Sequence, residues 1–137
     1  MKYLLDSNIC IAIMNRAALM KAITALNSAL ASGDTLLIST VVVYELWFGV
    51  AKSRDKVSNA NKVVEFFTEP LEILEFDTED AGKAGEIRAE LARRGTPIRP
   101  YDVLIAGQAL ARGLTLVTAN TREFSRVDGL KIVDWTQ

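Results

Sequence analysis

The feature that most restricts the fold of this chain is the alternation of short apolar runs with longer segments of helical period. The short runs predict strands at residues 2–5, 35–39, 71–76, 114–118 and 131–133. The segments between them predict helices at residues 17–31, 41–52, 59–67, 78–94 and 102–112, with a turn or short helix at 120–124. Strands that alternate with helices pack as a parallel sheet covered by helices on both faces. We therefore expect an α/β fold with a central, mostly parallel sheet.

Helical spacing also predicts which apolar side chains face the core. The stripes expected to point inward are Leu19, Ile23, Leu26 and Leu30 in the first helix, Val63, Val64 and Phe67 in the third, and Ala84, Ile87 and Leu91 in the fourth. Trp47, Phe48 and Phe124 are also expected in the core, with a partner peptide as the alternative contact for Trp47. On the solvated face of the fourth helix, Glu90 and Arg94 have the spacing of an ion pair.

The length and charge of the chain limit the kind of protein it can be. Its 137 residues suffice for a substantial core, half of them are hydrophobic, and we expect a single domain over residues 1–137. The 16 basic and 17 acidic residues give a net charge of −1, which does not favour nucleic-acid binding. If the chain binds RNA or DNA, local basic patches and a bound metal ion must supply the attraction.

The cysteine count and the N-terminus predict a cytoplasmic location. Cys10 is the only cysteine, so no intrachain disulfide can form, as is usual in a reducing compartment. Asp6 interrupts the first apolar run too early for a signal peptide, and no apolar stretch approaches the roughly 20 residues of a membrane helix. Cys10 itself lies in an apolar segment and is expected to be buried and unreactive.

The complete absence of histidine excludes several kinds of catalysis. Triads of Ser, His and Asp, Cys–His pairs, RNA cleavage by paired histidines and His-ligated zinc sites all require this residue. Any acid–base chemistry must therefore use carboxylates, Lys, Tyr or metal-bound water. A nucleotide-triphosphate enzyme is also disfavoured, because the sequence has no Gly-rich phosphate loop followed by Lys and Ser or Thr.

Three carboxylates stand next to apolar segments. Asp6 follows the first strand, Glu45 follows an apolar run at 41–44, and Asp102 precedes the apolar part of the last long helix. A charged group beside a core costs free energy unless it is compensated, and few basic residues are near these three in sequence. Asp6 also falls at the carboxyl end of a strand, where ligands bind in parallel sheets. The leading hypothesis is a hydrolase whose three carboxylates bind Mg²⁺ or Mn²⁺.

Each carboxylate also has a structural interpretation that the sequence leaves open. Asp6 and Asp102 can each be the N-cap of a helix, and Glu45 can be a partly exposed helix residue. If the three instead share a site, mutual repulsion raises their pKa values in the absence of metal, and a bound ion removes that cost. The ion would then orient and deprotonate a water for attack at phosphorus.

Further polar residues can complete such a site. Asn120 lies just beyond the strand ending at Thr118 and offers a neutral oxygen to a metal ion or its water, and Glu123 follows closely. Ser7 and Thr118 can orient ligands or waters. The alternatives are ordinary local roles, with Asn120 in a turn, Thr118 at a strand end and Ser7 at a helix cap.

Basic residues are concentrated in the second half of the chain. They are Arg88, Arg93, Arg94, Arg99, Arg112, Arg122 and Arg126. Arg93, Arg94 and Arg99 shortly precede Asp102 and can hold phosphates beside the site. The alternative for each of them is a solvated face.

Four segments that carry these polar residues match a known family. They are LLDSN at residues 4–8, YELWFG at 44–49, PYDVLIA at 100–106 and TANTREF at 118–124. In this order, over nearly the whole chain, they resemble the PIN-domain ribonucleases and, more narrowly, the VapC-type toxins of bacterial toxin–antitoxin pairs. Each segment is weak evidence alone, but the four in order are specific.

The resemblance implies a PIN-like α/β/α sandwich and Mg²⁺- or Mn²⁺-dependent endoribonuclease cleavage, often of structured RNA such as tRNA. It implies metal ligands at Asp6, Glu45 and Asp102, with a fourth site position near Asn120. Many members of the family have an acidic residue at that fourth position, whereas this chain has an amide, with Glu123 three residues on. The resemblance also implies a homodimer and a cognate antitoxin, whose tail lies in a groove by the site and carries a basic residue that neutralises the carboxylates.

Two other functions fit an α/β chain of this size. A phosphoacceptor signalling domain also has aspartates at strand ends, but it needs adjacent acidic residues after the first strand and a lysine after a late strand. Here Ser7 and Asn8 follow Asp6, and no lysine directly follows Thr118. A non-catalytic binding module would keep the fold as a scaffold, but the intact carboxylates argue against it.

Overall fold

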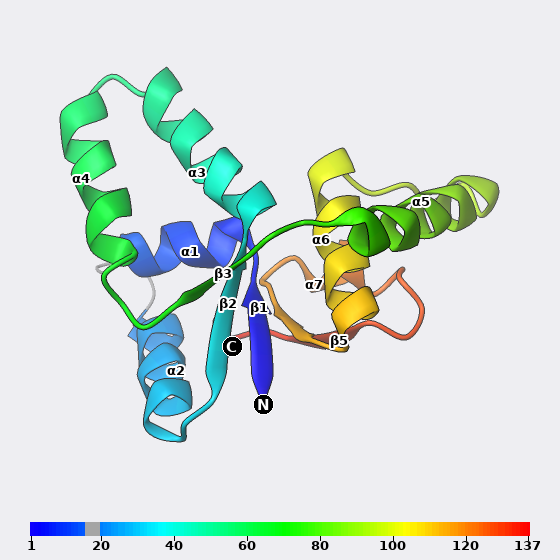
Figure 1. Ribbon diagram of the computed structural model, residues 1–137, viewed down its shortest axis with the longest axis horizontal. Helices are drawn as coiled ribbons and strands as arrows, with labels where there is room; N and C mark the ends of the chain where they lie inside the picture. The colour runs from blue at the N-terminus through cyan, green and yellow to red at the C-terminus, as the bar shows by residue number, and fades with distance from the viewer. Residues whose placement is uncertain (16–19) are drawn as a thin grey trace.

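The computed structural model describes residues 1–15 and 20–137, which form a three-layer α/β/α arrangement (Figure 1). Within these residues a five-stranded sheet has the order β3–β2–β1–β4–β5, and every neighbouring pair is parallel. The strands are β1 Lys2–Leu5, β2 Thr35–Ser39, β3 Glu72–Leu74, β4 Thr115–Val117 and β5 Lys131–Val133. The expected α/β class and parallel sheet are confirmed.

The helices cover both faces of the sheet because the strand order changes direction after β3. The helices before β3 lie on the left of the sheet in Figure 1 and are α1 Ser7–Met14, α2 Met20–Ala31, α3 Thr40–Lys52 and α4 Lys56–Phe66. Those after β3 lie on the right and are α5 Thr78–Arg93, α6 Pro100–Arg112 and α7 Thr121–Phe124. Crossover connections have a fixed hand, so a reversal along the sheet moves the helices to the opposite face. Among the described residues, none of these helices has the length and apolar character needed to cross a membrane.

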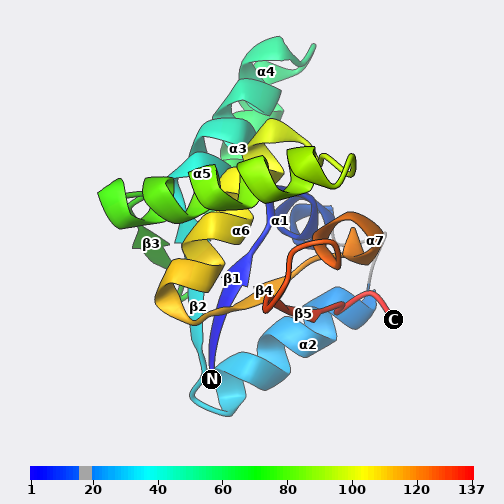
Figure 2. The same cartoon turned by 90° about the vertical axis from the view of Figure 1, so that its right-hand side faces the viewer.

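The core is centred on the middle strand β1 and its neighbour β4. Leu4 and Leu5 of β1 and Leu116 and Val117 of β4 have no exposed surface. Consecutive apolar residues are needed here because both faces of a central parallel strand are covered by helices. On the right-hand face α5 crosses α6, as Figure 2 shows, and the two helices touch closely. A Cβ added to Gly107 of α6 would lie 2.7 Å from the backbone of α5, so only glycine fits there.

Helix boundaries differ from the expected ones where a capping residue decides the start. α6 begins at Pro100 rather than at residue 102, because proline is favourable at the first helical position, where its missing N–H is not needed. α4 begins at Lys56 rather than at residue 59, because Asp55 caps it by accepting a hydrogen bond from the Ser58 N–H at 3.0 Å. The expected helix at 17–31 is seen from Met20 onward.

The predicted apolar stripes are confirmed on α5 and only partly elsewhere. Ala84, Ile87 and Leu91 are buried, and so are Leu26 and Phe124, while Ile23 and Leu30 are half-buried. On α4 the prediction is confirmed for Val63, which is buried, and in part for Phe67, which is half-buried against the core, but it is wrong for Val64, which is exposed; the buried aromatic residue there is Phe66. Leu19, the first residue of the expected α2 stripe, lies outside the described residues.

The prediction that Trp47 and Phe48 belong to the core is wrong. Trp47 is 40% exposed and Phe48 is 55% exposed. Both lie on α3, which pairs with α4 and extends with it beyond the end of the sheet (Figure 1). An apolar face at that point has no second layer to pack against. The two aromatic side chains are therefore available at the surface near Glu45.

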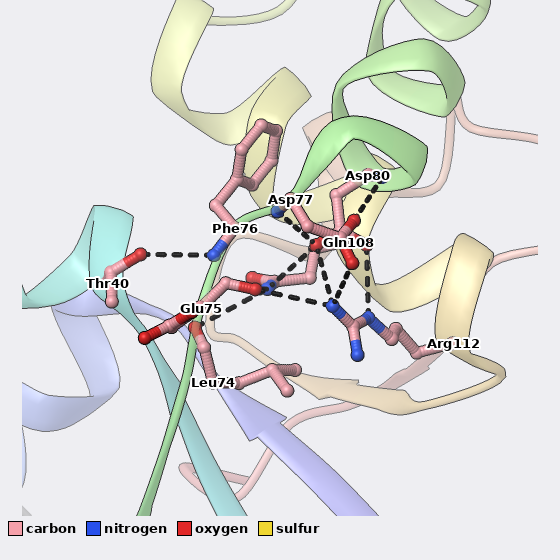
Figure 3. Close-up of polar contacts among 8 residues, drawn as sticks. All are labelled: Thr40, Leu74, Glu75, Phe76, Asp77, Asp80, Gln108 and Arg112. Atoms are coloured by element: carbon pink, nitrogen blue, oxygen red, sulfur yellow. Dashed lines mark hydrogen bonds and ion pairs between the residues drawn. The ribbon is translucent and has the colours of Figure 1, made fainter.

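A polar clamp holds the start of α5 against the end of α6, and we define it as Asp77, Asp80, Gln108 and Arg112 (Figure 3). Asp77 and Asp80 form a capping box, in which each carboxylate accepts the other's backbone N–H, at 2.9 and 3.0 Å. The guanidinium of Arg112 donates to Asp77 at 2.9 Å and to Asp80 at 3.1 and 3.2 Å. These contacts fix the position of α6 relative to α5.

The fourth member of the clamp ties α6 to the chain just after β3. The Gln108 amide donates to the carbonyl of Glu75 at 3.1 Å and to the Asp80 carboxylate at 3.2 Å. Asp80 and Gln108 are fully buried, so each needs partners within the fold. The side-chain oxygen of Gln108 has no hydrogen-bond partner among the described residues.

Candidate active site

The parallel topology brings the three candidate carboxylates to one end of the sheet. Asp6 directly follows β1, Glu45 lies in the first half of α3 after β2, and Asp102 lies in the first turn of α6. In Figure 1 the starts of α1, α3 and α6 lie at the upper end of the sheet, where the parallel strands end. A contact between α3 and α6 closes this end, because the hydroxyl groups of Tyr44 and Tyr101 are 3.2 Å apart.

Asp6 is the most buried of the three, with 4% of its surface exposed. It caps α1 by accepting the Ile9 N–H at 2.9 Å, so the capping interpretation is confirmed. Its carboxylate also bonds the side chain of Thr118. Burial nevertheless raises the pKa of Asp6 from 3.8 to about 6, because loss of water outweighs these hydrogen bonds. The hydrogen bonds of the cap therefore offset only part of the free-energy cost of burying the Asp6 charge.

Glu45 and Asp102 have raised pKa values for the same main reason. Partial burial raises the pKa of Glu45, and the nearby charges of Asp102 and Asp6 raise it further. Burial also raises the pKa of Asp102, whose side chain is only 13% exposed. The alternative that Asp102 is an N-cap is wrong, because Pro100 at the first helical position moves the start of α6 upstream and leaves Arg99 as the cap.

The three carboxylates influence one another without forming a closed metal cage. Asp102 raises the pKa of both Asp6 and Glu45, so the groups share one electrostatic environment. Among residues 1–15 and 20–137, no three His, Cys, Asp or Glu side chains lie close enough together to hold a metal ion as they stand. The donors are all carboxylate oxygens, which is the ligand chemistry that Mg²⁺ and Mn²⁺ prefer. The three residues therefore have the right ligand chemistry for such an ion, and their side chains would have to move closer together to bind it. We call Asp6, Glu45 and Asp102 the acid cluster.

The smaller polar residues of the prediction contact the acid cluster or each other. The Ser7 hydroxyl bonds Glu45, and the Thr118 hydroxyl bonds Asp6 while accepting the Asn120 N–H at 2.9 Å. The Asn120 side-chain amide donates to the Glu123 carboxylate. Glu123 in turn raises the pKa of Asp102. Asn120 and Glu123 therefore lie together beside the cluster, joined to each other.

Of the arginines expected to hold phosphates, Arg99 is the one that faces the acid cluster. Its Nε lies 3.4 Å from a carboxylate oxygen of Asp102. Arg93 and Arg94 instead pair with Glu90 on α5, with Arg94 at 3.7 Å as the spacing predicted. The solvated-face interpretation therefore holds for those two residues.

The Tyr44–Tyr101 contact was not predicted, although each tyrosine directly precedes a candidate carboxylate in the sequence. The family resemblance implied a groove by the site, but the residues that line it were not predicted. A groove of about 200 Å³ runs between α1, α3 and α4. Its lining includes Glu45 and the apolar residues Ile11, Met14, Leu46, Val50 and Val63, together with Asn15, Gly49, Asn59 and Lys62. Because the groove involves three helices, no single stretch of sequence contains its pattern.

Comparison with known proteins decides the family. A model of the PIN domain matches residues 3–130 of the chain. The tRNA(fMet)-specific endonuclease VapC of Salmonella typhimurium is 44% identical over 136 residues, which are 98% of each protein. The chain belongs to the PIN-domain family, as a VapC-type ribonuclease.

Solved structures of VapBC complexes contain chains with the same fold. The VapBC2 complex of Rickettsia felis, bound to a DNA fragment from its promoter, contains a chain that is 37% identical, with a TM-score of 0.89 over 98% of this chain and 99% of that one. The DNA-bound VapBC complex of Salmonella typhimurium contains one that is 42% identical, with a TM-score of 0.87 over 98% of both. The expected PIN-like sandwich is thereby confirmed.

Proposed function

We propose that this VapC-type ribonuclease cleaves a tRNA in a metal-dependent reaction at the acid cluster and is held inactive by a cognate antitoxin. The observation that carries the proposal is the shared site of Asp6, Glu45 and Asp102, whose pKa values are all raised. Burying carboxylates without enough compensating partners destabilises the folded state. Such groups are therefore more readily explained by a function that uses their charge. The relative named for tRNA(fMet) supports initiator tRNA as the substrate.

The three carboxylates of the cluster would hold Mg²⁺ or Mn²⁺, and neighbouring side chains would keep them in place. When bound, the ion supplies an activated water and neutralises charge on the scissile phosphate. Thr118 orients Asp6, and Ser7 orients Glu45, through the hydrogen bonds already described. Asn120 and Glu123, which bond each other beside Asp102, would form the fourth side of the site and offer further oxygen ligands there.

The groove beside Glu45 supports an antitoxin tail as the inhibitor. Its walls are mostly apolar, which suits an amphipathic segment of the partner, and Glu45 joins the groove to the acid cluster. A basic residue of that tail would neutralise the carboxylates that the reaction needs. Trp47 and Phe48 lie exposed on the same helix and can extend the contact. The expected homodimer stays a prediction.

The test is cleavage of purified tRNA by the isolated chain. Initiator and elongator methionine tRNAs are incubated with the protein and Mn²⁺ or Mg²⁺, and in parallel with EDTA. We expect a discrete cut in the initiator tRNA, none in the elongator tRNA, and no cut with EDTA. Equal cleavage in EDTA would refute the metal requirement, and equal cleavage of the two tRNAs would refute the substrate. Addition of the antitoxin encoded next to the toxin should abolish cleavage.

A further inference from the structure

Arg99 occupies a position that helix stability does not explain. It is the N-cap of α6, with an extended backbone that the following Pro100 favours, and its side chain makes no capping hydrogen bond. Helix caps are usually Ser, Thr, Asp or Asn, and a positive charge at a helix N-terminus opposes the helix dipole. Because Arg99 does not stabilise the helix that it caps, its position is better explained by another interaction of its positive charge in the fold.

That charge is directed at the acid cluster. The Nε of the Arg99 guanidinium lies 3.4 Å from a carboxylate oxygen of Asp102 and donates a hydrogen bond to it. The positive charge therefore stands beside one of the carboxylates proposed to bind metal. A bound metal ion would need the same carboxylate.

The contact is also weak enough to exchange. Arg99 is 65% exposed whereas Asp102 is 13% exposed, so the arginine approaches from the solvent side and can leave without disturbing the core. An ion pair in which the basic partner is exposed to solvent is weak, because water and salt screen it. A divalent ion that contacts several carboxylates at once can displace such a partner.

We propose that Arg99 is an internal counter-cation of the acid cluster, which pairs with Asp102 in the metal-free protein and competes with the metal ion for that carboxylate. This inference rests on the proposed function, since it takes the cluster to be the metal site. Arg99 then sets the metal concentration at which the nuclease becomes loaded. Once displaced, its guanidinium stands at the edge of the site, where an RNA phosphate would lie.

The test measures Mn²⁺ binding to the full chain by electron paramagnetic resonance at low salt. Arg99→Gln should tighten Mn²⁺ binding by about twofold to fivefold, because it removes a competing positive charge. Arg99→Lys, which keeps the charge, should stay closer to the wild type than Arg99→Gln. Arg93→Gln is the matched control, since Arg93 also pairs with an acid three residues away and is 70% exposed, but on α5. It should leave the affinity unchanged.

The outcomes separate this inference from the proposed function. Asp6→Asn is measured alone and together with Arg99→Gln, and it should weaken Mn²⁺ binding in both. If it does so, but Arg99→Gln binds no more tightly than the wild type or Arg93→Gln tightens binding equally, the counter-cation is refuted and the metal site stands. If Asp6→Asn has no effect in either background, the metal site is refuted and the counter-cation with it.

A second measurement follows the arginine without any substitution. The Nε–H of Arg99 donates to Asp102, so its ¹⁵N–¹H signal should differ from that of a solvated arginine. Addition of Mg²⁺ should move this signal toward the solvated position while that of Arg112 in the clamp stays constant. An Arg99 signal that does not respond at saturating Mg²⁺ would overturn the proposal.

Discussion

Two groups of carboxylates in this protein, one around the buried Asp80 and one around the buried Asp6, are treated in opposite ways by the fold. In the clamp, Asp77 and Asp80 accept backbone N–H groups at the start of α5 and share the guanidinium of Arg112. The hydrogen bond from the Asp80 N–H and the charge of Arg112 lower the pKa of Asp77. In the acid cluster, burial dominates and all three pKa values are raised. The clamp is electrostatically satisfied, and the cluster is not.

The difference separates a structural use of carboxylates from a functional one. The clamp joins α5 to α6 and so keeps Asp102, at the other end of α6, in place beside the sheet. Within the described part of the chain, the charge of the cluster is offset by Arg99, which is an exposed partner, by two hydroxyl groups and by the Ile9 N–H that Asp6 accepts. A group of buried acids with too few internal partners favours an external cation or a basic residue of another molecule. The comparison can be tested by removing charges from each region in turn.

The largest effect is expected when the cluster loses a carboxylate. Asp102→Asn and Asp6→Asn should each reduce tRNA cleavage by more than about 1,000-fold, which is over about 4 kcal/mol of transition-state stabilisation. Their circular dichroism spectra should match that of the wild type. Asp77→Asn in the clamp is the control and should keep the rate within about threefold. Full activity of either cluster variant would remove that residue from the mechanism.

Removing a charge from the clamp should instead lower the free energy of unfolding. Arg112→Met leaves the fully buried Asp80 with Gln108 as its remaining side-chain partner, so a buried carboxylate loses its counter-charge. We expect a clear loss of stability in urea unfolding at neutral pH, larger than that of an exposed pair. Arg93→Met, which breaks an exposed pair, should change stability by less than about 1 kcal/mol. Equal effects of the two substitutions would show that the clamp is not structural.

Removing a charge from the acid cluster should have the opposite effect and raise the free energy of unfolding. The pKa of Asp6 is about 6 in the fold against an ordinary value of 3.8, so the folded chain binds the proton more tightly and ionisation destabilises it. The cost is absent below about pH 4, grows between about pH 4 and pH 6 and is complete above that range, where it reaches about 1–3 kcal/mol.

Asp6→Asn removes this cost while keeping an oxygen that can accept the Ile9 N–H. In EDTA the variant should therefore be more stable than the wild type at pH 8 by about 1–3 kcal/mol, and the difference should shrink toward zero near pH 4. Urea unfolding at a series of pH values measures it. A difference that does not vary with pH would mean that the Asp6 charge is already compensated in the fold.

The smallest effect is expected at the fourth side of the site. Asn120→Asp adds a carboxylate beside Glu123 and the cluster, which a bound metal ion can use. The initial rate of tRNA cleavage with Mn²⁺ should stay within about threefold of the wild type or rise above it. Complete loss of activity in the folded variant would contradict the placement of Asn120 near the metal.

Much of this protein could be predicted from local sequence pattern. The period of apolar residues located the strands and most of the helices, because secondary structure depends mainly on neighbours within one or two turns. Predictions that depended on how the helices and strands pack together were less successful. Trp47 and Phe48 are apolar and at helical spacing, yet they are exposed, because α3 and α4 extend past the layer that would have covered them.

The sequence by itself determined the parallel α/β fold, the chemistry open to a chain without histidine, and the three acids that chemistry would use. Only the tertiary structure decided that Arg99, rather than Arg93 or Arg94, faces those acids, and that Asp80 is satisfied whereas Asp6 is not. Residue type and spacing specify which groups a chain carries. Burial and the distance to an opposite charge depend on segments far apart in sequence, and those two quantities set the free energy of the ionised side chains in the acid cluster and the clamp.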